Sequence, residues 1–217
     1  MRSQEFWDVH VKYDSLKVRD KHRLVWHFIT DVYPMLFDPI RYTMESILEL
    51  GVWKGGSVKA FHDYFPNTRI IGVDIDLSTC AAFGLPDSKT YPRMTLLTAN
   101  QGNVGDMRNL GEGHGPFEVI IDDAGHKYSQ QITSFEALWP YVAPGGLYII
   151  EDVFYRSRGH AHMLLNYFKD KVDPEYFLNP GPYEVQEGKV KDLSGVSFYQ
   201  GLIIVRKNPD IDPENVR

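Results

Sequence analysis

The sequence has little cysteine and no long apolar run. Cys80 is the only cysteine among the 217 residues, so no disulfide can form within the chain, and a reducing compartment is expected. No stretch of 18 consecutive apolar residues is present, which argues against a transmembrane helix. Residues 1–8 also lack the apolar core of a signal peptide. The sequence therefore predicts a soluble, cytoplasmic protein.

Basic residues are also in the minority. The chain has 23 Lys and Arg against 29 Asp and Glu, and its formal net charge is −6. Neither a nucleic acid nor an anionic membrane surface is therefore expected as a partner. Hydrophobic residues make up 43% of the chain, which is enough for a folded core, and the length of 217 residues predicts a single domain.

Strand-like apolar segments alternate with helix-like segments along most of the chain. Such alternation predicts an α/β fold with a mostly parallel, doubly wound sheet covered by helices on both faces. Two apolar runs near the end of the chain predict a hairpin that adds an antiparallel strand near the sheet edge. The expected strands are residues 46–51, 69–74, 93–97, 117–121, 146–150, 196–199 and 202–205. The expected helices are 19–37, 57–65, 129–142 and 162–171, with a turn at 143–146.

Two acidic clusters follow two of these strands. Asp122 and Asp123, with His126 close behind, end the first strand, and Glu151 and Asp152 end the second. A strand–helix–strand crossover makes the two strands parallel and usually adjacent, at a separation of about 4.8 Å. Carboxylates held this close repel one another unless a cation lies between them. The pattern predicts a divalent metal site; the alternative is that these acids only cap the following helices.

The ligand types in these clusters select among metals. Oxygen ligands without cysteine or a group of histidines favour Mg²⁺, or Mn²⁺, over Zn²⁺. Because Mg²⁺ takes six ligands, three carboxylates leave positions for water or for two oxygens of a sugar diol. An ion lowers the pKa of a bound hydroxyl, and the neighbouring imidazole of His126 can then accept the proton. Taken alone, His126 would instead be an ordinary surface histidine.

A glycine-rich turn follows the first expected strand. It runs from Glu49 to Ser57 and contains Gly51 and Gly55. Glycines at this point let the backbone pass close to a ligand, where a Cβ would collide. The same glycines also allow a strand to pack tightly against the following helix, so the turn alone does not establish a binding site.

Polar residues also follow the next two strands. Asp74 ends the second strand, where a carboxylate suits hydrogen bonding to the two hydroxyls of a ribose. The alternative is that Asp74 caps the turn that follows it. Asn100 and Gln101 come after the third strand, at the position where an adenine would be flanked. Together with the glycine-rich turn, these residues predict a nucleoside pocket beside the acidic clusters.

Four motifs carry a family resemblance. They are Glu-Leu-Gly-x-x-x-Gly-Gly-Ser from Glu49, Gly-Val-Asp ending at Asp74, Ile-Asp-Asp-x-x-His ending at His126, and Pro-Gly-Gly-Leu-Tyr-x-Ile-Glu-Asp ending at Asp152. Together they resemble class I S-adenosylmethionine-dependent methyltransferases. Within that superfamily they are most similar to the metal-dependent sugar O-methyltransferases of macrolide and related antibiotic biosynthesis, of the mycinamicin and macrocin type. The family's usual Asp-Asp-Gly-Ser-His segment reads Asp-Asp-Ala-Gly-His here.

The resemblance implies a role for each matching residue. Asp123, Glu151 and Asp152 would bind the divalent ion, and His126 would act as the general base, with Asp123 and His126 as the catalytic pair. Asp122 would lie against the methionine part of S-adenosylmethionine or form a structural hydrogen bond. The implied cofactor-binding residues are Glu49, Gly51, Gly55, Ser57, Asp74, Gln101 and Asp122.

The resemblance also implies an architecture and a reaction. A single domain, residues 1–217, would consist of a helical cap at 1–45 and a Rossmann-like, seven-stranded S-adenosylmethionine-binding core at 46–217. The reaction would be methyl transfer to a hydroxyl of a small molecule, in the first instance a glycosylated natural product, and a homo-oligomer is compatible with this reading. Three alternatives stay open: O-methylation of a phenolic or catechol-like diol, a cephalosporin-hydroxylase-like enzyme, and a cofactor-binding protein without transfer activity.

Overall fold

The computed structural model describes residues 4–15, 27–153, 158–172 and 192–210. Its strands are β1 (Ser46–Leu50), β2 (Arg69–Asp74), β3 (Met94–Thr98), β4 (Phe117–Asp122), β5 (Val142–Ile150), β6 (Leu193–Tyr199) and β7 (Leu202–Lys207). They form one sheet in the order β3-β2-β1-β4-β5-β7-β6. The first five strands are parallel to one another, and the β6–β7 hairpin extends the sheet as an antiparallel edge.

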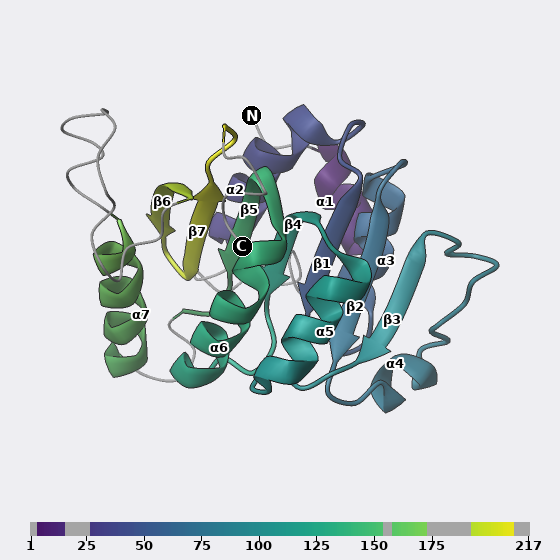
Figure 1. Cartoon of the computed structure of the whole chain (residues 1–217). Coiled ribbons are helices and arrows are strands. Elements are labelled where there is room, and N and C mark those ends of the chain that lie inside the picture. The colour runs from purple at the N-terminus through teal and green to yellow at the C-terminus, as the bar shows by residue number, and fades with distance from the viewer. Residues whose placement is uncertain (1–3, 16–26, 154–157, 173–191, 211–217) are drawn as a thin grey trace.

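Helices cover both faces of this sheet (Figure 1). They are α1 (Gln4–Lys12), α2 (His27–Phe37), α3 (Gly56–Tyr64), α4 (Ser78–Ala82), α5 (Val104–His114), α6 (Tyr128–Leu138) and α7 (Arg158–Lys171), with 3-10 turns η1 (Asp38–Ile40) and η2 (Trp139–Tyr141). In Figure 1, α5 and α6 lie in front of the sheet, and α1, α2 and α3 lie behind it. The fold is therefore a three-layer α/β sandwich, as expected.

The central strands supply a hydrophobic core on each face. In β4, Val119 and Ile121 face the core that contains α1, α2 and α3, whereas Ile120 faces the core that contains α5, α6 and α7. Successive residues of a strand point to opposite faces. A strand covered on both sides is therefore apolar at most of its positions, and this is why these strands are nearly continuous apolar runs in the sequence.

The sheet agrees with the sequence prediction, but several segments differ. All seven expected strands are present, and the hairpin lies at the sheet edge. The expected turn at 143–146 is instead part of β5: Gly145 has a φ of +75°, and the register with β4 shifts between Phe117 and Val119. The Pro-Gly-Gly segment is therefore an irregular stretch of strand rather than a separate connection.

The helix boundaries also needed correction. The helix expected at 129–142 ends at Leu138, since Pro140 has no N–H to continue it and the chain turns into η2. Helix α5 was not expected, because its three glycines weaken the helical pattern, but the side chain of Asn103 caps it. The short helix α4 was also missed. Helix α2 begins at His27, and positions 19–26 of the expected helix lie outside the described residues.

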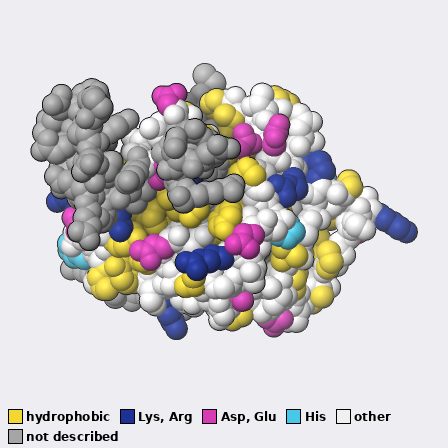
Figure 2. Space-filling view, viewed as in Figure 1, with side chains coloured by type: hydrophobic (Ala, Val, Ile, Leu, Met, Phe, Trp, Pro, Cys, Tyr) yellow, Lys and Arg dark blue, Asp and Glu magenta, His cyan; other side chains and the backbone are white. Residues whose placement is uncertain are grey.

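The described surface carries charges of both signs. On the face in Figure 2, Lys and Arg side chains are interspersed with Asp and Glu side chains. This mixture agrees with the small net charge of −6. None of the helices in the described part of the chain combines the length and the apolar character needed to cross a bilayer.

Candidate active site

A cavity of about 520 Å³ opens at the carboxyl ends of the parallel strands. It lies across the point where the strand order reverses, between β1 and β4, which is where ligands bind in doubly wound sheets. Its volume is within the range of small-molecule sites. The residues that line it are Leu50, Gly51, Trp53, Val73, Asp74, Ile75, Ala99, Asn100, Gln101, Asp123, Ala124, Gly125, His126, Gln130, Glu151 and Asp152.

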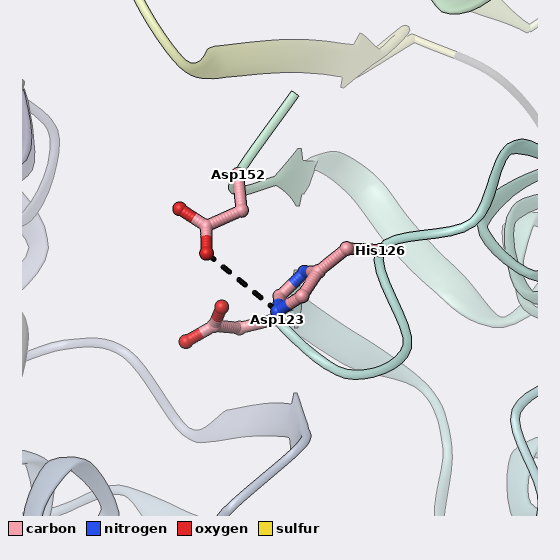
Figure 3. A group of neighbouring side chains, drawn as sticks. All are labelled: Asp123, His126 and Asp152. Atoms are coloured by element: carbon pink, nitrogen blue, oxygen red, sulfur yellow. Dashed lines mark ion pairs between the residues drawn. The ribbon is translucent and has the colours of Figure 1, made fainter. Parts of the chain in front are cut away.

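Three of these side chains point toward one another (Figure 3). Asp123 comes directly after β4, His126 lies on the loop that follows, and Asp152 comes shortly after β5. One potential ligand atom from each lies within 4.8 Å of the others, and His126 Nε2 is 3.6 Å from Asp152 Oδ2. Oxygen and nitrogen donors this close can share one divalent ion. The two acidic clusters of the sequence therefore meet in space, as the crossover predicts.

Glu151, the third expected carboxylate ligand, lies beside this group without being part of it. Its side chain lines the same cavity but is only 1% exposed. The buried hydroxyl of Tyr33 donates a hydrogen bond to Glu151 Oε1. Burial, together with the nearby charge of Glu151, raises the pKa of Tyr33 well above its ordinary value. Tyr33 therefore keeps its proton and remains a donor.

The charges of the cavity lining are of one sign. Among the described residues, the lining includes the carboxylates of Asp74, Asp123, Glu151 and Asp152 but no Lys or Arg. Carboxylates that are partly removed from water and close together destabilise each other's ionised form. A bound cation would relieve this repulsion. The donor types and their spacing therefore fit a divalent cation.

Backbone strain is concentrated at the same place. Four non-glycine residues of the described chain have φ in the left-handed region: Asp14 at +50°, Trp53 at +46°, His126 at +47° and Asp152 at +55°. Trp53, His126 and Asp152 line the main cavity, whereas Asp14 and Trp53 line a neighbouring one of about 300 Å³. Such conformations cost about 1–3 kcal/mol each and cluster at functional sites. No pattern in the sequence indicated them.

Asp122 does not reach the cavity. Its side chain is fully buried and accepts hydrogen bonds from the Gln101 amide, from Ser134 Oγ at 2.5 Å and from Tyr148 Oη at 3.0 Å. Burial raises the pKa of Asp122 to about 7, although the bonds from Ser134 and Tyr148 act in the opposite direction. Asp122 and Asp123 point to opposite sides of the strand end. These contacts are those of the structural hydrogen-bond role that was the alternative for Asp122.

The glycine-rich loop is held by two of the expected cofactor residues. Glu49 is buried, and its Oε2 accepts a hydrogen bond from Ser57 Oγ at 2.6 Å, which ties the end of β1 to the start of α3. Asp74 Oδ2 accepts from the backbone N–H groups of Val52 (3.1 Å) and Trp53 (2.9 Å). Asp74 therefore caps the glycine-rich loop after β1, rather than only the turn that follows it, and it also lines the cavity. The expected cofactor residues that do not line the main cavity are Glu49, Gly55, Ser57 and Asp122.

Gly51 allows the glycine-rich loop to touch the loop after β4. Its φ is +89°, and a Cβ at this position would clash with the backbone of Asp123 and Ala124. The N–H of Asp123 in turn donates to the carbonyl of Leu50 at 2.9 Å. The two loops are therefore in backbone contact at the point where the strand order reverses, and a side chain at residue 51 would separate them.

Gln101 connects the third strand to the same acidic loop. Besides its bond to Asp122, its Oε1 accepts from the backbone N–H of Gly125 at 2.8 Å. Gln130, from α6, also lies against Gly125 and lines the cavity. The sequence indicated Gln101 through its place after a strand. Gln130 and Trp53 were missed, because Gln130 lies within a helix and Trp53 occupies a variable position of the glycine-rich motif.

Comparison with known sequences identifies relatives of this region. Residues 48–153 match the family model described as a methyltransferase domain. The chain is 32% identical over 203 residues to the 8-demethyl-8-(2-methoxy-alpha-L-rhamnosyl)-tetracenomycin-C 3'-O-methyltransferase of Streptomyces olivaceus, which covers 84% of this chain and 50% of the relative. It is 33% identical over 136 residues to the mycinamicin VI 2''-O-methyltransferase of Micromonospora griseorubida, covering 59% and 32%. The chain thus spans at most about half the length of these curated relatives.

Comparison with solved structures gives a consistent result. The methyltransferase MycE of the mycinamycin pathway, solved with Mg, SAH and mycinamycin VI, superposes with a TM-score of 0.73 at 25% identity. The match covers 94% of this chain and 53% of MycE. A putative caffeoyl-CoA O-methyltransferase from Staphylococcus aureus shares the fold, with a TM-score of 0.57 at 19% identity over 92% of both chains.

Substitution of Gly51 by alanine tests the contact between the two loops. Gly51→Ala forces a side chain both into an unfavourable φ and against the Asp123 backbone, so the free energy of unfolding is expected to fall on the order of 2–4 kcal/mol. Gly84→Ala is the matched control, because Gly84 has a φ of +76° but nothing within 4 Å of an added Cβ. It is expected to lose only about 1 kcal/mol. Equal losses in urea unfolding would contradict the proposed constraint.

Substitution of Asp122 tests its structural role. Asp122→Ala removes the acceptor for three buried donors, so the free energy of unfolding is expected to fall on the order of 3 kcal/mol. Asp122→Asn keeps one acceptor oxygen and is expected to lose less. Denaturant unfolding of both variants measures the difference. An alanine variant as stable as the asparagine variant would show that these hydrogen bonds contribute little.

Proposed function

We propose that this chain, whose residues 48–153 match the methyltransferase domain family, acts as an S-adenosylmethionine- and Mg²⁺-dependent O-methyltransferase on a hydroxyl of a glycosylated small molecule. One observation carries the proposal: a cavity at the topological switch point joins a nucleoside-type lining to a cluster of carboxylates and an imidazole. Methyl transfer to a hydroxyl needs both a donor site and a means of removing the hydroxyl proton.

The cavity lining supports an adenosyl donor on the side of β2 and β3. Asp74 ends β2 and Ile75 follows it, whereas Asn100 and Gln101 follow β3. These residues would hold the adenosine part. Gly51 lies between this side and Asp123, where the backbone of both loops approaches the cavity without a Cβ in the way. We therefore assign the donor-binding role to Gly51, Asp74 and Gln101. We assign to Glu49, Gly55 and Ser57 the indirect role of holding the glycine-rich loop in its conformation.

The acidic end of the cavity supports the metal half of the proposal. Asp123, Glu151 and Asp152 would hold the ion, since all three line the cavity and no Lys or Arg is present in the described lining. When bound, such an ion would supply Lewis-acid chemistry, lowering the pKa of the hydroxyl that is to be methylated. The carboxylates would hold the ion at one end of the cavity, and orienting the acceptor in this way would contribute to the rate enhancement.

His126 is proposed as the general base. Its Nδ1 is buried, so Nε2, which faces Asp152 at 3.6 Å, is the nitrogen available to the reacting group. His126 Nε2 accepts the proton that the acceptor hydroxyl loses as its oxygen takes the methyl group and the donor's sulfur becomes neutral. Because His126 also belongs to the group of side chains that could hold a metal ion, a test must distinguish a general base from a fourth ligand.

The relatives support a sugar hydroxyl as the acceptor. The curated proteins that match at 31–36% identity are named as O-methyltransferases of macrolide or tetracenomycin compounds, most of them glycosylated. They favour the transferase over the hydroxylase-like and non-catalytic alternatives. The caffeoyl-CoA enzyme shares only the fold at 19% identity, so it adds no support for a phenolic acceptor. We further propose that residues 46–217 form the catalytic core and 1–45 a cap on it.

Removal of the metal tests the proposed mechanism directly. With S-adenosylmethionine and a panel of antibiotic glycosides, S-adenosylhomocysteine formation is expected to stop in EDTA and to return with Mg²⁺ or Mn²⁺. Asp123→Asn is expected to lower turnover by about a hundredfold or more, because a ligand and its charge are lost, while donor binding by calorimetry persists. Glu112→Gln, an exposed carboxylate on α5, serves as the control with unchanged turnover. Undiminished turnover in EDTA would contradict the metal mechanism.

Substitution of His126 separates its two candidate roles. If His126 is the base, His126→Asn lowers kcat by about 10²–10⁴-fold and leaves the Kd for Mn²⁺ nearly unchanged. The rise of kcat with pH in the wild type is then expected to disappear in the variant, since only an unprotonated imidazole accepts the proton. His114→Asn, at the end of α5, is the matched control. A parallel loss of Mn²⁺ affinity and kcat would identify His126 as a ligand instead.

A further inference from the structure

Tyr33 is a buried residue of α2 whose hydroxyl reaches the edge of the candidate site. Its side chain is 0% exposed and does not line the cavity. The hydroxyl donates to Oε1 of Glu151, 118 positions further along the chain. No motif in the sequence pointed to Tyr33, and the mechanism described above does not use it. The bond is nevertheless made to one of the three carboxylates proposed to hold the metal.

The ring of Tyr33 is held by the aromatic residues of the N-terminal helices. Its centroid is 4.8 Å from that of Phe37 in the same helix, and 6.1 Å from that of Phe6 in α1, at an interplanar angle of 86°. Both neighbours are almost completely buried. Because interiors are close-packed, this ring has little room to move. The direction of its hydroxyl is therefore fixed by the packing of α1 and α2 behind the sheet.

The backbone of Glu151 is held from the opposite layer. The side-chain amide of Gln131 in α6 donates to the carbonyl of Glu151 at 3.2 Å. His160 of α7 supports Gln131: the backbone N–H of Tyr128 donates to His160 Nδ1 at 3.0 Å, so His160 Nε2 carries the proton and donates to Gln131 Oε1 at 3.0 Å. The backbone of Glu151 is thus held by Gln131 of α6, on one face of the sheet, and its carboxylate is held by Tyr33 of α2, on the other face.

We propose that Tyr33 is a positioning residue that aims the Glu151 carboxylate at the divalent ion, and that the N-terminal cap thereby contributes to metal affinity. The inference rests on the proposed function, because it takes Glu151 as a metal ligand. A buried carboxylate, here 1% exposed, is held in one orientation by a hydrogen-bond donor such as the Tyr33 hydroxyl. The hydroxyl supplies such a donor without bringing a positive charge that would compete with the cation.

The alternative role for Tyr33 is simple packing of the cap. Tyr64 provides the matched comparison, since it is also 0% exposed and packs edge-on against the same Phe6 ring at 5.1 Å. Its hydroxyl donates to Asp38, in η1, rather than to a residue of the cavity. Tyr33→Phe and Tyr64→Phe therefore each delete one buried hydroxyl from the same aromatic cluster, but only the first deletes a bond to Glu151.

The test is Mn²⁺ binding to the full chain, measured by electron paramagnetic resonance and calorimetry without acceptor. Loss of a hydrogen bond to a metal ligand typically costs 10–100-fold in affinity, so Tyr33→Phe is expected to raise the Kd for Mn²⁺ at least about tenfold. Tyr64→Phe is expected to stay within about twofold of wild type. In a Glu151→Gln background, Tyr33→Phe should have little further effect, because the two substitutions act on one ligand. Thermal melts of the metal-free proteins report the packing contribution separately.

Each outcome decides between the two roles. An unchanged Kd in Tyr33→Phe, or equal losses in Tyr33→Phe and Tyr64→Phe, would overturn the positioning role while leaving the proposed methyl transfer intact. The positioning role would be supported if the Kd for Mn²⁺ rises in Tyr33→Phe but not in Tyr64→Phe, while thermal melts show similar stability for the two metal-free variants. Failure of the wild type to bind Mn²⁺ would overturn both this inference and the metal half of the proposed function.

Discussion

The candidate site depends on one electrostatic constraint: several carboxylates are held near each other at the end of a parallel strand pair. The pairing of β4 with β5 fixes this arrangement, since Asp122 lies opposite Ile150 in the register and the N–H of Glu151 donates to the carbonyl of Asp122 at 3.0 Å. The ladder therefore delivers Asp123 and Asp152 to the same point. Because the acids cannot move apart without breaking strand hydrogen bonds, a cation is the available means of reducing their repulsion.

The rest of the local structure resists that repulsion. The acidic loop is tied to Leu50 by a backbone hydrogen bond and to Gln101 through Gly125. Asp122 is buried behind the loop and accepts hydrogen bonds from Gln101, Ser134 and Tyr148. Residues with strained backbone, His126 and Asp152, occur where the chain must turn back toward the cavity. A rigid frame of this kind keeps ligand atoms in place before an ion or an acceptor arrives, which lowers the cost of binding them.

Some of the site could be read from the sequence, because strand ends are marked by local patterns. Apolar runs that stop at an acid identified Asp74, Asp123, Glu151 and Asp152, and the spacing of one crossover predicted that the acidic clusters meet. The roles of Asp122 and Asp74 could not be read in the same way. Asp122 and Asp123 are identical residues in neighbouring positions, but the side chain of Asp123 points into the cavity and that of Asp122 points into the interior. The contact of Tyr33 with Glu151 could not be predicted from the sequence either, since the two residues are 118 positions apart.

The sequence by itself determined the order of the strands along the chain, the fold class, and the acids and glycines at the strand ends, because these depend on period, turn residues and short spacing. Only the tertiary structure decided which of those residues line one cavity. It also decided that Glu49 and Asp122 hold neighbouring elements together through hydrogen bonds and that a tyrosine of α2 reaches Glu151. These are contacts between segments far apart in the chain, and they are set by the packing of layers rather than by any local pattern.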